Sequence, residues 1–221
     1  MKVSQALIAR KSVRAYLKKE VEKEKIQFIL EHARFCPSGV NMQPWQVCVV
    51  QGDKKIELEN KLLVAFKNNQ KELMDYDYYP LEWSEPYKSR RKETGLLMYE
   101  TLKIKREDKQ KQYDQWAMNY KAFEAPVVLY FFIDKSLAKG SYLDYGMFWQ
   151  SIMLLACEVG LTTCPQASLA EFPKTIKKEL SVPEDKILLG GIALGYEDKD
   201  ALVNSYRTSR IKVEEFTTFY E

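Results

Sequence analysis

Residues 127–133 read VVLYFFI, a run of seven apolar residues that are mostly β-branched or aromatic. A run of this composition is typical of a central strand whose two faces are both covered. Residues 45–50 (WQVCVV) and 187–194 are also short and apolar, and they predict two further strands. The short segment that follows Gly160 has a similar, β-prone composition.

Helical periodicity surrounds these strands. In residues 22–35 the apolar side chains recur at intervals of three and four, and the Pro37–Gly39 stretch stops the helix. The predicted helices cover residues 4–9, 22–35, 54–72, 88–104, 108–123 and 142–159. Helices that alternate with a few central strands predict an α/β (α+β) fold, in which a mixed central sheet is flanked by helices on both faces.

The length of 221 residues suits one domain, residues 1–221. Residues from about 60 to 123 are charged and helical, and we expect them to form a variable helical lobe. The chain becomes polar from about residue 198, yet residues 214–220 (EEFTTFY) have a strand-like composition. An arm that ends in this way needs a partner chain, so we expect residues 198–221 to be exchanged in a homodimer.

Composition narrows the class of protein. The formal net charge is +3, with cations and anions interspersed, which argues against a dedicated nucleic-acid surface. The four cysteines form no CxxC pair and no apolar run reaches membrane-spanning length, so we expect free thiols in a cytoplasmic protein. His32 is the only histidine, which argues against a His-rich metal site or a Ser-His-Asp hydrolase. We expect no bound metal.

The segment Arg10-Lys11-Ser12-Val13-Arg14 has three cations and a hydroxyl in five residues. In an extended backbone Arg10, Ser12 and Arg14 share one face, and this set of donors suits a phosphate group. A solvated basic turn explains the segment alone at least as well. In the tail, Arg207 and Arg210 offer a second pair of phosphate ligands or a plain charged terminus.

Two loops are rich in hydrogen-bonding groups. The loop at residues 37–45 (PSGVNMQPW) holds amide and hydroxyl side chains that suit a planar polar heterocycle, although turn geometry alone also explains it. Residues 160–168 (GLTTCPQAS) run from a buried helix into a loop whose free backbone N–H groups could face a ligand. Cys164 lacks a histidine base, which favours a buried structural thiol.

These four pieces, in this order, resemble the nitroreductase family of FMN-dependent oxidoreductases. RKSVR matches the opening R-x-S-x-R/K element of the family, PSGVNMQPW its P-S-x-x-N-x-Q-P-W loop, and GLTTCPQ its G-L-x-T-C-P segment. The ending from Gly195 resembles the G-Y-x-D…N-x-F-R-T-x-R…E-E-F ending of one large branch. The resemblance covers essentially the whole chain, and the variable lobe is the part that it informs least.

The resemblance implies a homodimer with an FMN site at each end of the subunit interface. It places Arg10, Ser12 and Arg210 at the FMN phosphate with Lys11 close by, and it places Arg14 near the N1–C2 edge of the flavin.

The resemblance also assigns contacts to the flavin ring and the ribityl chain. These contacts come partly from the other subunit and involve Pro37, Ser38, Asn41 and Gln43. Pro165, Gln166 and Ala167 would line the ring, with a backbone N–H directed at N5. Many relatives carry Glu-Gly or Gly-Gly after that proline, so the polarity beside N5 is expected to differ here. Asn68, Asn69 and Lys71 are weak candidates for the pyrimidine edge.

The implied activity is ping-pong hydride transfer from NADH or NADPH, through FMN, to an electron-poor small molecule such as a nitroaromatic or a quinone. FMN carries the chemistry, so no catalytic side chain is required. Reductive dehalogenation of a halophenol, non-enzymatic storage of FMN, and a plain α/β binding domain without flavin remain alternatives. The aromatic residues Tyr76, Tyr79, Trp83 and Tyr87 are candidates for a substrate wall, although an aromatic mini-core under a loop would contain the same cluster.

Overall fold

In the computed structural model, which describes residues 1–221, the predicted central strand lies inside a four-stranded sheet of order β1-β2-β4-β3. The strands are β1 (Gln46–Gln51), β2 (Val127–Asp134), β3 (Thr162–Gln166) and β4 (Lys186–Gly195), and each neighbouring pair is antiparallel. A single parallel bridge joins Ser12 to Thr163 of edge strand β3, so the N-terminal basic segment extends this edge of the sheet. The fold is therefore the expected α+β class.

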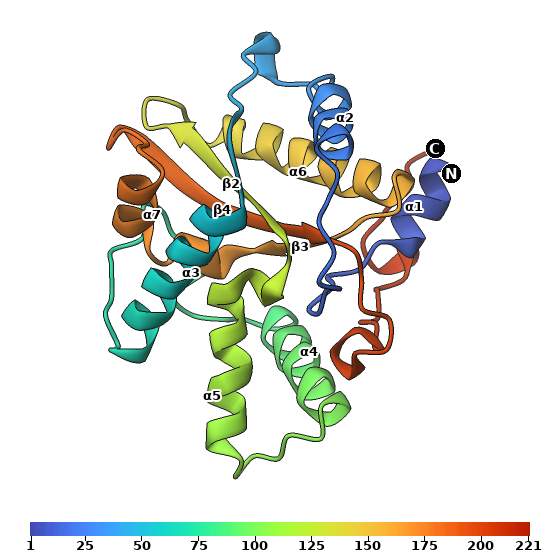
Figure 1. Ribbon diagram of the computed structural model, residues 1–221. Helices are drawn as coiled ribbons and strands as arrows, with labels where there is room; N and C mark the ends of the chain where they lie inside the picture. Colours follow the sequence, from blue (N-terminus) through green and yellow to red (C-terminus); the bar gives the residue numbers. More distant parts are fainter.

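Strand β2 separates two apolar cores because alternate side chains of a strand point to opposite faces. Leu129 and Phe131 pack in the core beneath α2 and α6, whereas Val128 and Phe132 pack in the core beneath α3 and α7. Helices therefore cover both faces of the sheet (Figure 1). The α-helices are α1 (Val3–Ala9), α2 (Lys23–Ala33), α3 (Gly52–Lys67), α4 (Tyr87–Thr101), α5 (Lys109–Ala117), α6 (Gly140–Glu158) and α7 (Pro173–Glu179).

Two predicted helices end earlier than expected. Helix α3 stops at Lys67, and Asn69 takes a positive φ of 50°, which residues inside a right-handed helix do not adopt. The segment predicted as a helix to residue 123 is α5 followed by η2 (Met118–Glu124), a 3₁₀ turn in which Ala122 and Phe123 are left-handed. That turn leads the chain into β2. Helix α7 was not predicted, because its seven residues are too few to show a helical period.

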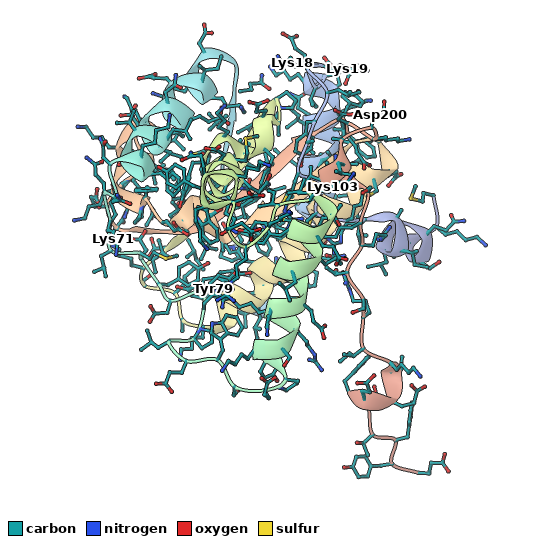
Figure 2. The ribbon with its side chains drawn as sticks, turned by 90° about the horizontal axis from the view of Figure 1, so that it is seen from below. Lys18, Lys19, Lys71, Tyr79, Lys103 and Asp200 are labelled. Carbon is teal, nitrogen blue, oxygen red and sulfur yellow. The ribbon has the colours of Figure 1, made fainter.

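The predicted strand-like end at residues 214–220 is wrong for the isolated chain. Residues Val213–Glu215 form the 3₁₀ turn η5, and the residues after it have no regular structure. A strand needs a neighbour to pair with, and Figure 2 shows this tail leading away from the body. Phe219 and Tyr220 are 78% and 92% exposed, which is unusual for aromatic side chains in a single folded chain.

Helices α4 and α5 project from the body on the side of the sheet that α3 covers (Figure 1). Neither helix contains a buried residue, so they add little to the two cores. The segment between α3 and α4 is irregular and carries the aromatic cluster. None of the helices combines the length and the apolar character needed to cross a membrane.

A bulge in the β2–β4 pair positions β3. The register shifts between Phe131 and Phe132, and Gly190 takes a φ of +135°. A Cβ atom at Gly190 would lie 2.8 Å from the carbonyl oxygen of Gln166 and 3.2 Å from the Trp149 ring. Glycine is therefore required at this position for both its backbone conformation and the close approach of β3.

We expect Gly190→Ala to lower the free energy of unfolding by more than about 1 kcal/mol, because the added methyl group collides with backbone and the φ is strained. Gly95→Ala is the matched control, since a Cβ there meets nothing within 4 Å. Gly95 lies inside α4, so its replacement should stabilise the protein by up to about 1 kcal/mol. Urea unfolding followed by circular dichroism measures both changes, and equal effects would contradict the steric explanation.

Candidate functional site

The N-terminal basic segment and the C-terminal tail meet at a cavity of about 570 Å³, which we call the basic cavity. The predicted phosphate ligands of both segments line it, together with Thr94 of α4. These residues are Arg10, Lys11, Ser12, Arg14, Arg207 and Arg210. The structure therefore brings together side chains that lie about two hundred positions apart in the sequence.

The positive charge of the basic cavity is largely uncompensated. Partial burial lowers the pKa of Arg10, and the nearby charge of Arg210 lowers it further. Lys11 is the cation of this set that has a carboxylate partner, Glu197, at 2.7 Å. Two guanidinium groups that repel each other without a counter-ion favour the binding of a multivalent anion.

Asn204 fixes the tail against the basic segment. Its side chain is 2% exposed and makes three hydrogen bonds to backbone. The Oδ1 atom accepts from the N–H of Arg14 at 2.8 Å, and Nδ2 donates to the carbonyl oxygens of Ala15 and Asp198 at 2.9 and 2.8 Å. The backbone carbonyl of Asn204 accepts from Lys11. One buried amide thus sets the relative position of the two segments.

The two tail arginines have different roles. The guanidinium of Arg207 donates to the carbonyl oxygens of Ile8, Ala9 and Arg10, with 2.8 Å to that of Arg10. These carbonyls end α1, so Arg207 caps a helix and its donors are occupied. Arg210 instead bonds only within the tail, to Thr208 and Ser209, and leaves the rest of its fork open to the cavity.

Arg14 also lines a second cavity of about 260 Å³, which we call the ring cavity. Its floor comes from β3 and the turn that follows, with Pro165, Gln166 and Ala167, and its walls include Tyr79 and Phe123. The guanidinium of Arg14 has no carboxylate partner and donates to the hydroxyl of Tyr206 at 3.0 Å. Because Arg14 belongs to both cavities, a ligand that reaches from one to the other passes this side chain.

Gln166 is a buried polar group with an unused acceptor. Its side chain is 4% exposed, and Nε2 donates to the carbonyl oxygen of Asn119 at 2.9 Å. The Oε1 atom is buried and has no hydrogen-bond partner. An unpaired buried acceptor is costly, so a ligand N–H group in the ring cavity would stabilise this residue. The residues present therefore fit a planar ring with hydrogen-bonding edges.

Two ionisable groups beside the ring cavity have shifted pKa values. Burial raises the pKa of Glu171, whose Oε2 accepts a hydrogen bond from the Tyr120 hydroxyl at 2.5 Å. Burial also raises the pKa of the Cys164 thiol to about 11. A thiol with this pKa is protonated at neutral pH, which agrees with a structural rather than a nucleophilic cysteine.

The predicted ring-binding loop lines neither of these two cavities within its own chain. Pro37, Ser38, Asn41 and Gln43 line neither the basic cavity nor the ring cavity. The Ser38 hydroxyl accepts from the N–H of Gln43 at 2.9 Å, and the N–H of Gly39 donates to Asp144 of α6. Asn41 and Gln43 have positive φ angles, and Val40 between Ser38 and Gln43 is 94% exposed. The tip of the loop is thus exposed and does not line either cavity of its own chain.

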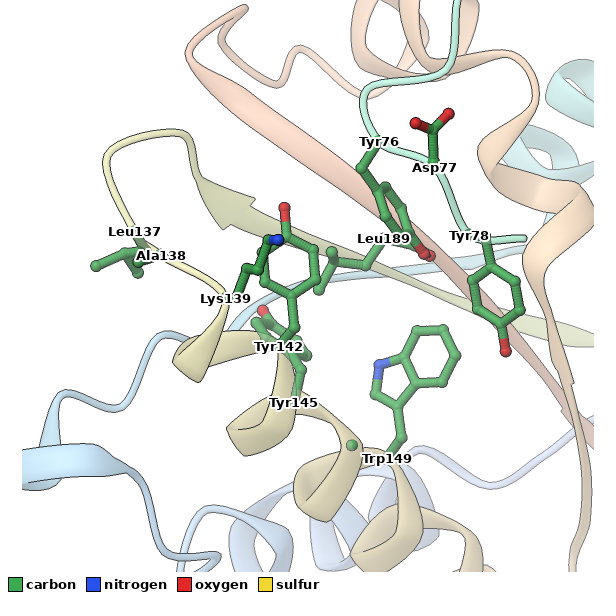
Figure 3. A pocket seen from close by; sticks show the side chains of 11 residues that line it. Tyr76, Asp77, Tyr78, Leu137, Ala138, Lys139, Tyr142, Tyr145, Trp149 and Leu189 are labelled. Atoms are coloured by element: carbon green, nitrogen blue, oxygen red, sulfur yellow. The ribbon is translucent and has the colours of Figure 1, made fainter. Parts of the chain in front are cut away.

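The four aromatic candidates do not line a single cavity. Tyr76 lines a third cavity of about 890 Å³, beside Tyr142 and Trp149 (Figure 3). Its hydroxyl donates to the carbonyl oxygen of Leu189 at 2.6 Å, which makes it a structural anchor. Tyr79 lines the ring cavity and its ring lies 5.5 Å from that of Trp83, whereas Tyr87 is exposed at the start of α4.

The sequence did not indicate Asn119 or Glu171 as site residues, and it indicated Asn204 only as the first residue of the tail motif. Asn119 and Glu171 line the ring cavity, whereas Asn68, Asn69 and Lys71 do not. Lys71 lies at the edge of the body remote from the tail (Figure 2). The sequence does not single out Asn119, because it predicts residues 108–123 as one helix.

Comparison with known proteins shows the family of the chain. The model of the Nitroreductase family matches residues 7–196, so the chain belongs to this family. It is 36% identical over 211 residues to a 4-nitrobenzoate reductase of Pseudomonas putida, a match that covers 96% of this chain and 92% of the relative.

Two solved structures are similar over the full length of the chain. The FMN and NADPH-dependent nitroreductase NfnB of sphigopyxis sp. strain HMH has a TM-score of 0.96 and 34% identity, and each chain is covered completely. The FMN-dependent nitroreductase NfnB of Mycobacterium smegmatis, solved with NADPH, has a TM-score of 0.93 and 30% identity, also with complete coverage of both chains.

We expect Asn204→Ala to lower the free energy of unfolding by about 2–4 kcal/mol, because three hydrogen bonds to buried backbone groups are lost. Denaturant unfolding measures this cost. Ser205→Ala is the control, since the Ser205 hydroxyl is exposed and bonds only to the carbonyl of Leu202 within the same turn. A loss at Ser205 as large as at Asn204 would show that the whole turn, and not the buried amide, holds the tail.

Proposed function

We propose that the protein is an FMN-dependent oxidoreductase that transfers hydride from NADH or NADPH to an electron-poor acceptor such as a nitroaromatic or a quinone. The observation that carries this proposal is that Arg14 lines both the basic cavity and the ring cavity. A flavin mononucleotide has a dianionic phosphate at one end and a planar hydrogen-bonding ring at the other. The solved relatives described as FMN and NADPH-dependent nitroreductases support the same reading.

In this proposal Arg10, Ser12 and Arg210 hold the phosphate, and Lys11 adds charge while it remains paired to Glu197. Arg207 supports them indirectly because it fixes the end of α1 from which Arg10 leaves. Gln166, with Pro165 and Ala167, supports one face of the ring, and its free Oε1 is available to a ring N–H. Apart from Lys11, these assignments use cavity donors that have no carboxylate partner, together with the unpaired acceptor of Gln166.

Bound FMN would supply the hydride chemistry, and the protein would supply position and charge. Arg14, at the junction of the cavities, would face the N1–C2 edge and stabilise the negative charge that two-electron reduction creates there. The tyrosine Tyr206 holds the Arg14 guanidinium through the 3.0 Å hydrogen bond. Phe123 lies 5.9 Å from the same guanidinium and covers it on the side of the lobe.

We further propose that the working unit is a homodimer in the cytoplasm. The strained loop around Val40 and the tail around Phe219 expose apolar side chains that a second copy would cover. On α6, Leu143 is also 74% exposed, next to the Asp144 side chain that holds the loop. The loop residues Pro37, Ser38, Asn41 and Gln43 would then reach the ring cavity of the partner subunit. Four free thiols suit a reducing compartment.

The proposed activity predicts that the purified protein is yellow and that anaerobic NADH or NADPH bleaches its visible absorption. A nitroarene should restore the absorption, whereas a halophenol should not. Stopped-flow spectroscopy measures both half-reactions separately, which is the signature of a ping-pong mechanism. A flavin that neither NADH nor NADPH bleaches would leave FMN storage as the function, and restoration by a halophenol alone would identify a dehalogenase.

We expect Arg10→Ala and Arg210→Ala each to weaken FMN binding by about 1.5–3 kcal/mol, the scale of a charge-assisted hydrogen bond. Titration of the apoprotein with FMN, followed by flavin fluorescence, measures the change. Arg34→Ala is the matched control, because Arg34 is a surface arginine paired with Glu31 at 2.6 Å. Unchanged FMN affinity in the first two variants would refute the phosphate assignment.

A further inference from the structure

A row of aromatic rings leads from the ring cavity to helix α4. Tyr79, a wall residue of the cavity, lies 4.7 Å from Tyr78 and 5.5 Å from Trp83 between ring centroids. The guanidinium of Arg91 lies 5.2 Å from the centroid of the Trp83 ring. A cation stacked on an indole keeps its planar fork available while its side chain is held in place.

Arg91 has no carboxylate partner in the structure. Arg34, in contrast, is held by Glu31 at 2.6 Å. The charge of Arg91 nevertheless reaches the cavity wall. Burial and the neighbouring Tyr78 raise the pKa of Tyr79, and the charge of Arg91 opposes that rise. An uncompensated cation therefore acts on the hydroxyl of a residue that lines the ring cavity.

We propose that Arg91 selects acceptors that carry an anionic substituent, such as a nitrobenzoate, by pairing with the carboxylate at the mouth of the ring cavity. The proposal rests on the function proposed above. A carboxylate in the para position projects away from the nitro group across a flat ring. The nitro group can therefore face the flavin proposed to occupy the ring cavity while the carboxylate stays outside with Arg91, and Tyr79 and Trp83 offer aromatic faces to the ring between them.

The acidic residue of the ring cavity is compatible with this arrangement. Glu171 lines the cavity, and an anionic group placed beside it would be repelled. Burial raises the pKa of Glu171, and its Oε2 is engaged by the Tyr120 hydroxyl. Arg91 is not itself a wall residue of the cavity, so a carboxylate held by Arg91 lies outside the wall that Glu171 helps to form.

The adjacent Arg90 provides a matched control on the same helix. Its guanidinium lies 5.9 Å from the ring of Tyr87. It lines a groove of about 850 Å³ between α4 and the tail, which shares Thr208 and Arg210 with the basic cavity but no residue with the ring cavity. Removal of its charge changes the net charge of α4 as much as removal of Arg91, but on another side of the helix.

The experiment compares 4-nitrobenzoate with nitrobenzene as acceptors for the FMN-loaded protein reduced by NADPH. In Arg91→Gln we expect the ratio of kcat/KM for 4-nitrobenzoate to that for nitrobenzene to fall about tenfold to a hundredfold. Arg90→Gln should leave the ratio within about twofold of the unchanged protein, and Arg91→Lys should restore part of the preference. Arg91→Glu should give the lowest ratio.

A second readout does not depend on turnover. 4-Nitrobenzoate should perturb the visible spectrum of the oxidised flavin when it binds, and its dissociation constant should rise in Arg91→Gln by a similar factor. An equal loss for nitrobenzene, or an unchanged dissociation constant, would overturn the role of Arg91. If neither nitroarene reoxidises the reduced flavin, the proposed function itself fails, which is a different result from reduction of both acceptors without preference.

Discussion

The side-chain amide of Asn204 is the interaction on which the rest of the site depends. It satisfies the backbone of Arg14 and Ala15 from the tail, and this places two basic segments of opposite ends of the chain against each other. Like charges would otherwise keep these segments apart. Arg207 also holds the tail through the carbonyls of Ala9 and Arg10, and Arg14 donates to the hydroxyl of Tyr206, but none of these bonds uses a carboxylate. The guanidinium groups of Arg10, Arg14 and Arg210 thus remain without carboxylate partners and available to a ligand.

The sheet determines where this contact can form. Strand β3 is an edge strand, and its free edge accepts the bridge from Ser12 to Thr163. The same strand continues to Gln166, which lies against the bulge at Gly190. One short strand therefore runs between the end that we propose binds the phosphate and the end that we propose binds the ring. At the centre of the sheet, the β2 residues Val128–Ile133 are almost fully buried between the two apolar cores.

The sequence predicted the parts of the fold that depend on local pattern. The strand at residues 127–133 and the helix at residues 22–35 are visible from composition and period, and both are present. The convergence of Arg10 with Arg210 required the family motifs, because no local rule relates residues so far apart. The turn at Ala122 and Phe123 could not be predicted, since left-handed residues other than glycine leave no sequence signature. No strand forms at the end of the tail, because the isolated chain offers it no neighbouring strand to pair with.

The unused groups of the two cavities define their ligand jointly. A small anion would satisfy Arg10 and Arg210 but leave the Oε1 of Gln166 unpaired, and a neutral aromatic ring would do the reverse. Only a molecule with both features, long enough to pass Arg14, relieves both costs at once. The exposed loop around Val40 concerns the second face of the proposed ring. In the proposed complex β3 would support one face of the planar ring, and the other face would be open to the acceptor and to a loop of a second subunit. The position of edge strand β3 therefore accounts for both the charge of the basic cavity and the open side of the ring cavity.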